Sequence, residues 1–308
     1  MTVEVVVPTV GRPSLARALA PLVGRVPVCV VDDRPVPQAL DVPAGVRVVR
    51  SGGRGPAAAR NAGWRSSGAD WVAFLDDDVE PPDDWVDGLH RDLAACGPGA
   101  AGTQGRIVVP LPAGRRPTDW ERSTAGLERA VWATADLAYR RSALEEVDGF
   151  DERFPRAYRE DADLGLRLVR AGWTVEQGTR CVVHPVRPAR WTQSLRSQRG
   201  NADDVLMRRK HGPRWREQAH VPQGRRRWHL ATTASLLGAV AVPRARRPLG
   251  AVALGLTADL VRRRVAPGPP QPREVATMVV TSALLPHAAT WWWLRGWVAA
   301  ARGAGPPR

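Results

Sequence analysis

The sequence predicts an α/β protein built on a doubly wound, mostly parallel β-sheet and followed by a helical C-terminal region. Two observations predict the sheet: short β-branched runs alternate with helix-compatible stretches, and polar clusters follow the runs where strands would end. Ligands bind at the carboxyl ends of strands in such sheets, so these clusters are the first candidates for a functional site. With 308 residues, 44% of them hydrophobic, the chain can form one large core with an appendage, or two domains.

Strands and helices alternate in the first part of the chain. Strands are expected at residues 3–7, 26–31, 46–49 and 71–75, with helices at 14–23 and 57–66. The pattern weakens after Pro98, and several later prolines indicate a long loop over the site. Order returns at Trp132, with helices expected at 142–147 and 161–171 and strands at 173–175 and 181–183.

Charge is distributed unevenly along the chain. The net charge is +14, and residues 206–308 hold 18 Arg and Lys against 3 Asp and Glu, so all of the excess positive charge is C-terminal. This asymmetry predicts an anionic partner for the C-terminal region, either phospholipid head groups or nucleic acid. The rest of the chain is expected to form a nearly neutral globular unit.

The cysteines and the first residues indicate a cellular compartment. Cys29, Cys96 and Cys181 are odd in number and lack metal-ligand spacing, which favours buried thiols in a reducing compartment. The chain enters a strand directly, without the basic head and long apolar stretch of a secretory signal, so a cytoplasmic protein is expected.

Three consecutive carboxylates, Asp76, Asp77 and Asp78, follow the fourth predicted strand. Carboxylates this close raise one another's pKa unless a cation or a set of donors neutralises them. Mg²⁺ or Mn²⁺ would do so, because these ions prefer oxygen ligands and bind through one or two carboxylates plus substrate phosphates. An acid-rich helix start explains Asp83 and Asp84 better than it explains the triple.

Five segments, taken in order, resemble the family 2 glycosyltransferases of GT-A fold, a Rossmann-like architecture. They are residues 7–12 (VPTVGR), 31–34 (VDDR), 55–63 (GPAAARNAG), 74–78 (FLDDD) and 159–164 (REDADL). Each motif alone is a weak signal, but five at family spacing are specific. The resemblance runs from about residue 3 to about residue 204 and includes residues 134–141 and 149–152, which are similar to the family's acceptor-side connection.

The resemblance implies transfer of a sugar from a nucleotide diphosphate donor to an acceptor hydroxyl, with inversion at the anomeric carbon. Negative charge develops on the departing diphosphate, and a metal held by carboxylates stabilises it. By analogy with the family's DxD motif, Asp78 is the expected metal ligand and Asp76 contacts the metal or the ribose. Asp77 is placed on the donor side, and the expected cofactor is Mn²⁺ or Mg²⁺.

The acceptor hydroxyl needs a carboxylate base within hydrogen-bond reach. In the family the base lies in an acidic pair at a helix start, which here is Glu160 and Asp161. Asp161 is the first candidate and Glu160 the alternative. A helix N-cap with first-turn acids also explains the pair, and one pair can serve both purposes.

Further residues are assigned through the same resemblance. Nucleotide recognition is expected from Thr9, Arg12, Asp32 and Asp33. The match departs from the commoner Asp-Asp-x-Ser, because Asp33 is followed by Arg34 and Pro35, which leaves the nucleotide undetermined. The remaining candidates are Arg60 and Asn61 beside a Gly-rich turn, His184 as a third metal ligand, and Asp136, Arg196 and Arg199 on the diphosphate or acceptor side.

The predicted domains are residues 1–215, with the catalytic function, and 216–308, which are basic, Trp-rich and helical. Apolar stretches at 229–242 and 248–256 are too short to span a bilayer, and 275–294 is borderline. Residues 266–272 resemble a linker or turn. Interfacial or re-entrant helices fit this composition, with Trp at the head-group level and Arg facing anionic lipid. The alternative is a helical subdomain packed through its Trp residues.

The leading hypothesis is therefore an inverting, metal-dependent glycosyltransferase, peripheral or monotopic on the inner face of the cell membrane. Its expected partners are a nucleotide diphosphate sugar, a glycan or lipid-linked acceptor of the cell envelope and an anionic membrane surface; no nucleic acid is expected. Two alternatives stay open. One is a sugar nucleotidyltransferase, although the Gly-rich and basic signature near the first strand is absent. The other is a non-catalytic protein that binds nucleotide sugars or nucleic acid.

Overall fold

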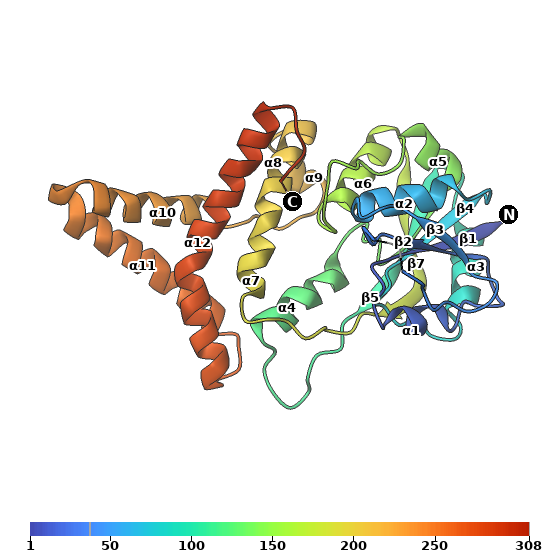
Figure 1. Cartoon of the computed structure of the whole chain (residues 1–308), viewed down its shortest axis with the longest axis horizontal. Helices are drawn as coiled ribbons and strands as arrows, with labels where there is room; N and C mark the ends of the chain where they lie inside the picture. Colours follow the sequence, from blue (N-terminus) through green and yellow to red (C-terminus); the bar gives the residue numbers. More distant parts are fainter. Residues whose placement is uncertain (37, 308) are drawn as a thin grey trace. The chain divides into compact units, whose positions relative to one another are not determined.

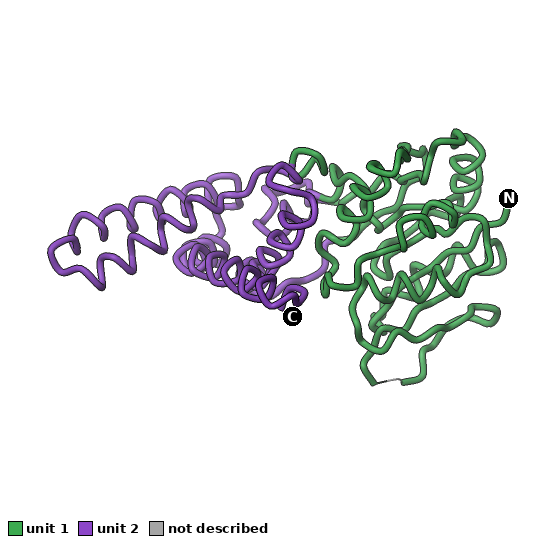
Figure 2. Tube along the Cα trace, turned by 90° about the horizontal axis from the view of Figure 1, so that it is seen from above, with its two compact units in different colours: residues 1–110, 127–185, 217–221 green, residues 111–126, 186–216, 222–308 purple. Residues whose placement is uncertain are grey.

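The computed structural model describes residues 1–36 and 38–307, which divide into two compact units (Figures 1 and 2). Unit 1 comprises residues 1–110, 127–185 and 217–221, and unit 2 comprises residues 111–126, 186–216 and 222–308. The chain therefore leaves unit 1 after residue 110 and returns to it at residue 127. The predicted domain boundary at residue 215 stays a prediction, because compact units and functional domains need not coincide.

Unit 1 is built on a seven-stranded sheet with the order β3-β2-β1-β4-β6-β5-β7. The strands are β1 (Val3–Thr9), β2 (Val28–Asp32), β3 (Arg47–Arg50), β4 (Trp71–Leu75), β5 (Ala100–Val108), β6 (Asp136–Arg140) and β7 (Thr174–Val183). Only β6 runs antiparallel to its neighbours β4 and β5 among the described strands. The predicted α/β class with a mostly parallel sheet is confirmed.

Helices cover both faces of this sheet. The helices of unit 1 are α1 (Leu15–Leu19), α2 (Pro56–Arg65), α3 (Trp85–Ala95), α5 (Arg141–Glu146) and α6 (Glu160–Arg170), with the short η1 (Gly126–Arg129) at its border with unit 2. Helices α2 and α6 lie on one side of the sheet and α1 and α3 on the other (Figure 1). Helix α2 packs closely because Gly63 faces β1: a Cβ there would come within 2.3 Å of Val6 Cγ1.

The core explains why the first strands could be predicted. Every residue of β2 and β4 is buried, and β1 is buried except at Pro8, so these strands are mostly apolar, as parallel strands covered on both faces are. Helix α1 is shorter than the expected 14–23, because the chain turns after Leu19. Cys29 is buried as expected, whereas Cys96 and Cys181 are half-buried, and all three are free thiols.

Two expectations about the second half of the sheet are wrong. The stretch after Pro98 was expected to be a loop, but it forms β5, and residues 136–140 form the unpredicted strand β6. The two strands expected at 173–175 and 181–183 are one ten-residue strand, β7. The polar residues at the centre of β7 give no strand pattern in the sequence. One of them, Arg180, is buried only because it forms ion pairs with Asp92 and Asp136, which lie far away in the sequence.

Unit 2 is helical. Its helices are α4 (Asp119–Ala125), α7 (Gln193–Arg196), η2 (Ser197–Arg199), α8 (Gly200–His211), α10 (Arg226–Ala241), η3 (Pro243–Ala245), α11 (Arg246–Val265) and α12 (Pro272–Ala301), and α9 (Trp215–Gln218) lies at its border with unit 1. The expected turn at 266–272 separates α11 from α12. No helix among the described residues is both long enough and apolar enough to span a membrane.

Candidate active site

Polar side chains gather where β1 and β4 end. These strands are parallel neighbours, so Thr9 and the acidic triple occupy the same edge of the sheet. The Thr9 hydroxyl donates a hydrogen bond to Asp77 Oδ2 at 2.5 Å, and Arg12 forms an ion pair with the other oxygen of Asp77. Asp77 is buried, so its charge is compensated inside the protein by the loop that follows β1.

Arg60 joins two of the predicted acidic motifs. It lies on α2, its side chain is 3% exposed, and its guanidinium donates to Glu160 Oε1 at 2.8 Å and to Asp76 Oδ1 at 2.9 Å. The loop after β4 and the start of α6 therefore meet on one buried arginine. Arg60, one of the candidates predicted from the sequence, lies between Asp76 and Glu160 and contacts both.

The acidic pair begins α6, as the sequence predicted. Glu160 is buried, and burial together with the neighbouring charge of Asp161 raises the pKa of Glu160 to about 8, against the opposing effect of Arg60. Burial also raises the pKa of Asp161, whose side chain keeps some contact with solvent and accepts the Ala162 N–H at 2.7 Å. Arg60 and Arg159 oppose this rise at Asp161, and the negative charge of Asp161 favours a proton on the neighbouring Glu160.

Asp78 and His184 form a second pair. A bridge between Glu80 and Val183 brings the end of β7 beside the loop after β4, and His184 Nε2 lies 3.7 Å from Asp78 Oδ1. The other ring nitrogen, Nδ1, is buried and has no hydrogen-bond partner. Within the part of the chain that the structure describes, no group of three His, Cys, Asp or Glu side chains is arranged to hold a metal.

The donor set of this pair is compatible with a divalent cation. One carboxylate and one imidazole fit Mn²⁺ or Mg²⁺ when substrate phosphates and water complete the coordination, which is how Mg²⁺ commonly binds. Asp76, the other predicted ligand, points to Arg60 instead. The residues therefore fit a metal that binds together with a phosphorylated substrate.

The two acids at the end of β2, Asp32 and Asp33, are engaged within the protein. Arg34 holds Asp32 with two hydrogen bonds of 2.8 Å, and this contact lowers the pKa of Asp32. Asp33 accepts from Ser51 Oγ at 2.6 Å and from the Gly55 N–H at 2.9 Å, at the start of α2. Gly55 has φ of 105°, which favours glycine. Asp33 therefore fixes the turn that positions Arg60 on α2.

Two other candidates, Asn61 and Asp136, have hydrogen-bond partners within unit 1. Asn61 exchanges hydrogen bonds with the backbone of Phe150 and accepts from Trp64, so it anchors the loop before α6. Asp136 is fully buried, accepts from Trp85 Nε1 at 3.0 Å and pairs with Arg180 at 2.8 Å. Both side chains have internal partners that account for them.

The arginines expected on the diphosphate or acceptor side belong to unit 2. Both Arg196 and Arg199 are exposed, and the guanidinium of Arg199 lies over the Trp292 ring at 5.5 Å from its centroid. Their predicted roles stay predictions.

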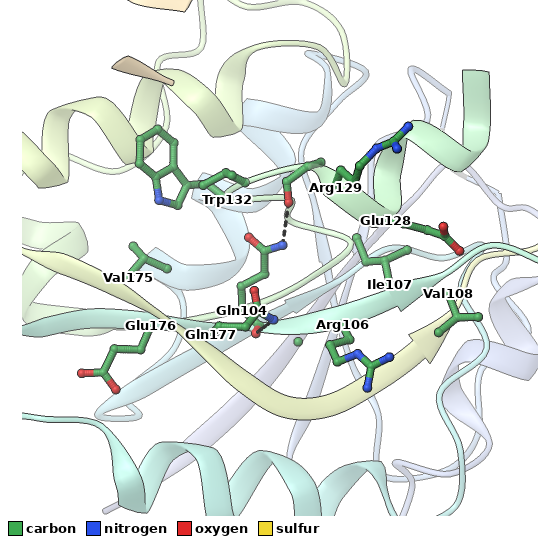
Figure 3. Close-up of a pocket in the computed structure, with 13 residues that line it drawn as sticks. Gln104, Arg106, Ile107, Val108, Glu128, Arg129, Trp132, Val175, Glu176 and Gln177 are labelled. Atoms are coloured by element: carbon green, nitrogen blue, oxygen red, sulfur yellow. Dashed lines mark hydrogen bonds between the residues drawn. The ribbon is translucent and has the colours of Figure 1, made fainter. Parts of the chain in front are cut away.

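Sequence reasoning missed a tyrosine and a cavity. Tyr139 on β6 is fully buried, its hydroxyl has no hydrogen-bond partner, and burial together with the charge of Asp161 raises its pKa. A cavity of about 640 Å³ lies beside β5 and β7 (Figure 3). It is lined by Gln104, Gly105, Arg106, Ile107, Val108, Glu128, Arg129, Ala130, Val131, Trp132, Val175, Glu176 and Gln177. None of the candidates named above lines it, and no motif marked it because β5 was not predicted.

The cavity wall supports α6. Trp132 packs against Gly165, where a Cβ would come within 2.2 Å of the indole, so α6 approaches through this glycine. Gln104 donates from its side chain to the Ala130 carbonyl at 2.8 Å, which holds the segment before Trp132 in place (Figure 3). The start of α6, with its acidic pair, is thereby fixed from two sides, by Trp132 and by Arg60.

With this geometry established, comparison with known proteins identifies the domain. Residues 4–147 match the model of the family described as glycosyl transferase family 2. These residues form a family 2 glycosyltransferase domain. The matched range contains Arg60 and the acidic triple of the glycosyltransferase domain, and it ends before Glu160, Asp161 and His184.

Individual relatives resemble parts of the chain. The pre-mycofactocin glycosyltransferase of Mycobacterium tuberculosis is 37% identical over 133 residues, which are 39% of this chain and span only 27% of that relative's length. The mannosyltransferase PcManGT from Pyrobaculum calidifontis, in complex with GDP-Man and Mn²⁺, has a TM-score of 0.51 at 16% identity and covers 97% of this chain and 86% of its own. At that identity the likeness shows the fold alone, and the predicted GT-A fold is confirmed.

Proposed function

We propose that the chain is an inverting, metal-dependent glycosyltransferase that moves a sugar from a nucleoside diphosphate donor to an acceptor hydroxyl. The observation that carries this proposal is the convergence on Arg60 of Asp76, from the loop after β4, and Glu160, from the start of α6. These two acidic motifs lie far apart in the sequence, and their meeting would supply the donor end and the acceptor end of one reaction site.

Asp78 and His184 would hold the divalent cation. Their separation of 3.7 Å and the carboxylate–imidazole donor set support Mn²⁺ or Mg²⁺. When bound, the cation supplies Lewis-acid stabilisation of the charge that develops on the leaving diphosphate. The donor complex of the Pyrobaculum mannosyltransferase, with GDP-Man and Mn²⁺, supports the same donor class for this chain.

Asp161 would act as the general base. Its carboxylate accepts the proton of the acceptor hydroxyl while that oxygen attacks the anomeric carbon from the face opposite the diphosphate, whose bond to the sugar breaks. Glu160 is the less suitable base, because it is buried and its carboxylate is held by Arg60, whereas the side chain of Asp161 keeps some contact with solvent. Glu160 instead positions Arg60.

Thr9 and Arg12 would meet the nucleotide at the end of β1, with Asp32 and Asp33 beside them at the end of β2. Both acids are already held by hydrogen bonds within the protein. Unpaired acids at this position would repel the diphosphate, so the observed pairing supports recognition of the ribose and base by hydrogen bonds. Arg12 is 37% exposed and neutralises Asp77, so it reduces that repulsion at the phosphate end.

The acceptor is proposed to be a glycan or a lipid-linked saccharide of the cell envelope, presented at the inner face of the membrane. The basic C-terminal region supports this location, because 18 Arg and Lys between residues 206 and 308 face only 3 acids. The charge pattern also makes the anionic membrane surface the proposed partner of unit 2.

A panel of nucleoside diphosphate sugars tests the proposal. Melting temperatures are measured with each donor in Mn²⁺ and in chelator, because a ligand that binds only the native state stabilises it, by about 2.7 kcal/mol at one hundred times its Kd. The expected result is stabilisation by one donor that requires the metal and is lost in Asp78→Ala. If every donor leaves the melting temperature unchanged in Mn²⁺, the proposed function is wrong.

A further inference from the structure

The helical hairpin of α10 and α11 exposes apolar side chains at its tip. The two helices run antiparallel and are joined by η3, and the turn lies at the end of the hairpin farthest from α12 (Figure 1). Leu237, Val240 and Leu254 are 64%, 78% and 71% exposed, and Val242 and Val252 are about half exposed. Large apolar side chains gathered in this way mark a surface that another body covers.

The base of the hairpin has partners of its own. Thr233 on α10 bonds to His287 Nδ1 at 3.0 Å on α12, and Arg264 on α11 donates to Thr281 and Ser282 of α12 at 2.9 and 3.1 Å. Between the helices, a Cβ on Gly238 would meet Leu249 at 2.7 Å, so the two helices pack tightly. The tip is therefore a supported structure whose outward apolar side chains are not needed to hold it together.

The charge around the tip indicates its partner. Residues 226–258 contain five arginines and no aspartate or glutamate, and Arg244, Arg246 and Arg247 lie in and beside the turn. All three are exposed, and none makes an ion pair with another described residue. Arginines beside exposed Leu and Val suit the boundary between anionic head groups and acyl chains. There the guanidinium groups meet the head groups and the apolar side chains meet the acyl chains.

We propose that residues 236–254, the tip of the α10–α11 hairpin, insert into an anionic phospholipid surface. Leu237, Val240 and Leu254 enter the acyl boundary, and the three arginines of the turn contact phosphate groups. The proposal deepens the membrane location given above, because it names the element that makes the contact. It does not depend on the transfer reaction, since no residue of the tip belongs to the glycosyltransferase domain.

Vesicle sedimentation of the full chain tests this assignment. The probes are vesicles of phosphatidylcholine alone and vesicles of phosphatidylcholine with phosphatidylglycerol in equal parts. The wild type is expected to bind the mixed vesicles and to be released by about 1 M salt, where the Debye length falls to about 3 Å. Strong binding to phosphatidylcholine alone that salt does not weaken would overturn the proposed role of the arginines.

Three variants identify the surface. Val240→Asp with Leu254→Asp is expected to lower vesicle affinity at least tenfold, and Arg244→Gln with Arg246→Gln and Arg247→Gln by about 100-fold, at about fivefold per arginine. The matched control is Val48→Asp, which places the same charge on an exposed valine of β3 in unit 1 and should bind as the wild type does. Wild-type binding by both tip variants would overturn the proposal.

Two further measurements distinguish a lipid surface from a second copy of the chain and from the transfer reaction. Gel filtration reports whether a second copy covers the tip: a wild-type dimer that the Asp variants convert to monomer would overturn the lipid assignment. Donor stabilisation in Mn²⁺ without vesicles should be the same in the tip variants and the wild type. A protein that binds vesicles through the tip but is stabilised by no donor would refute the proposed function and leave this inference standing.

Discussion

Charged side chains are arranged differently in the two units. At the strand ends of unit 1, acids and arginines pair with one another inside the protein, as Arg60 does with Asp76 and Glu160. At the tip of the α10–α11 hairpin in unit 2, arginines are exposed and no acid lies nearby in the sequence. Buried pairs fix a geometry, whereas exposed like charges act on an external partner. The composition alone, with arginine abundant throughout, does not separate these two uses.

The largest effect is expected for the proposed catalytic base. Asp161→Asn removes the proposed base with little change in size, so kcat should fall by about 10²–10⁴-fold while donor binding is kept. Single-turnover transfer and donor thermal stabilisation measure the two quantities. Asp83→Asn, at an exposed position before α3, is the control. Wild-type turnover by Asp161→Asn would leave Glu160 as the remaining candidate.

The next largest effect is a loss of stability, expected when the buried acid Asp136 is removed. Asp136→Ala leaves Arg180 buried without one of its two carboxylate partners, so the free energy of unfolding should fall by about 3–5 kcal/mol. Asp87→Ala, which breaks the exposed pair with Arg25, should cost at most about 1 kcal/mol. Denaturant unfolding measures both. Equal stability of the two variants would argue against a structural role for Asp136.

Metal binding gives a smaller and more specific effect. Asp78→Asn and His184→Gln should each raise the Mn²⁺ concentration needed for donor binding more than about tenfold, since even residues behind metal ligands contribute about 10–100-fold. His90→Gln, an exposed histidine on α3, is the matched control. Titration of Mn²⁺ at fixed donor concentration measures the shift. An unchanged titration for His184→Gln would remove it from the ligand set.

The smallest effect concerns pH. The pKa of Glu160 is raised by burial to about 8, so protonated Glu160 favours the folded state. This contribution is complete below about pH 4.3, the ordinary value for Glu, and is lost as the pH rises through 8. As the pH rises between these two values, the melting temperature of Glu160→Gln should therefore fall less than that of the wild type. Parallel curves for the two proteins would contradict the raised pKa.

Much of the site was predictable because parallel strands end at the same edge. Thr9 and the acidic triple follow adjacent parallel strands, so local patterns were enough to bring them together. Asn61 and Asp136 were predicted through the family resemblance, and in the structure one anchors a backbone loop and the other pairs with a buried arginine. Their partners lie at distant positions in the sequence, and no local pattern reveals them.

The sequence by itself determined the α/β class, the position of the acidic clusters after strands and the separation of net charge along the chain, because each depends on neighbouring residues. The tertiary structure decided the antiparallel strand β6, the full length of β7 and the meeting of Asp76 with Glu160 on Arg60. Those features depend on burial of polar groups, which is stable only when partners from elsewhere in the chain satisfy them.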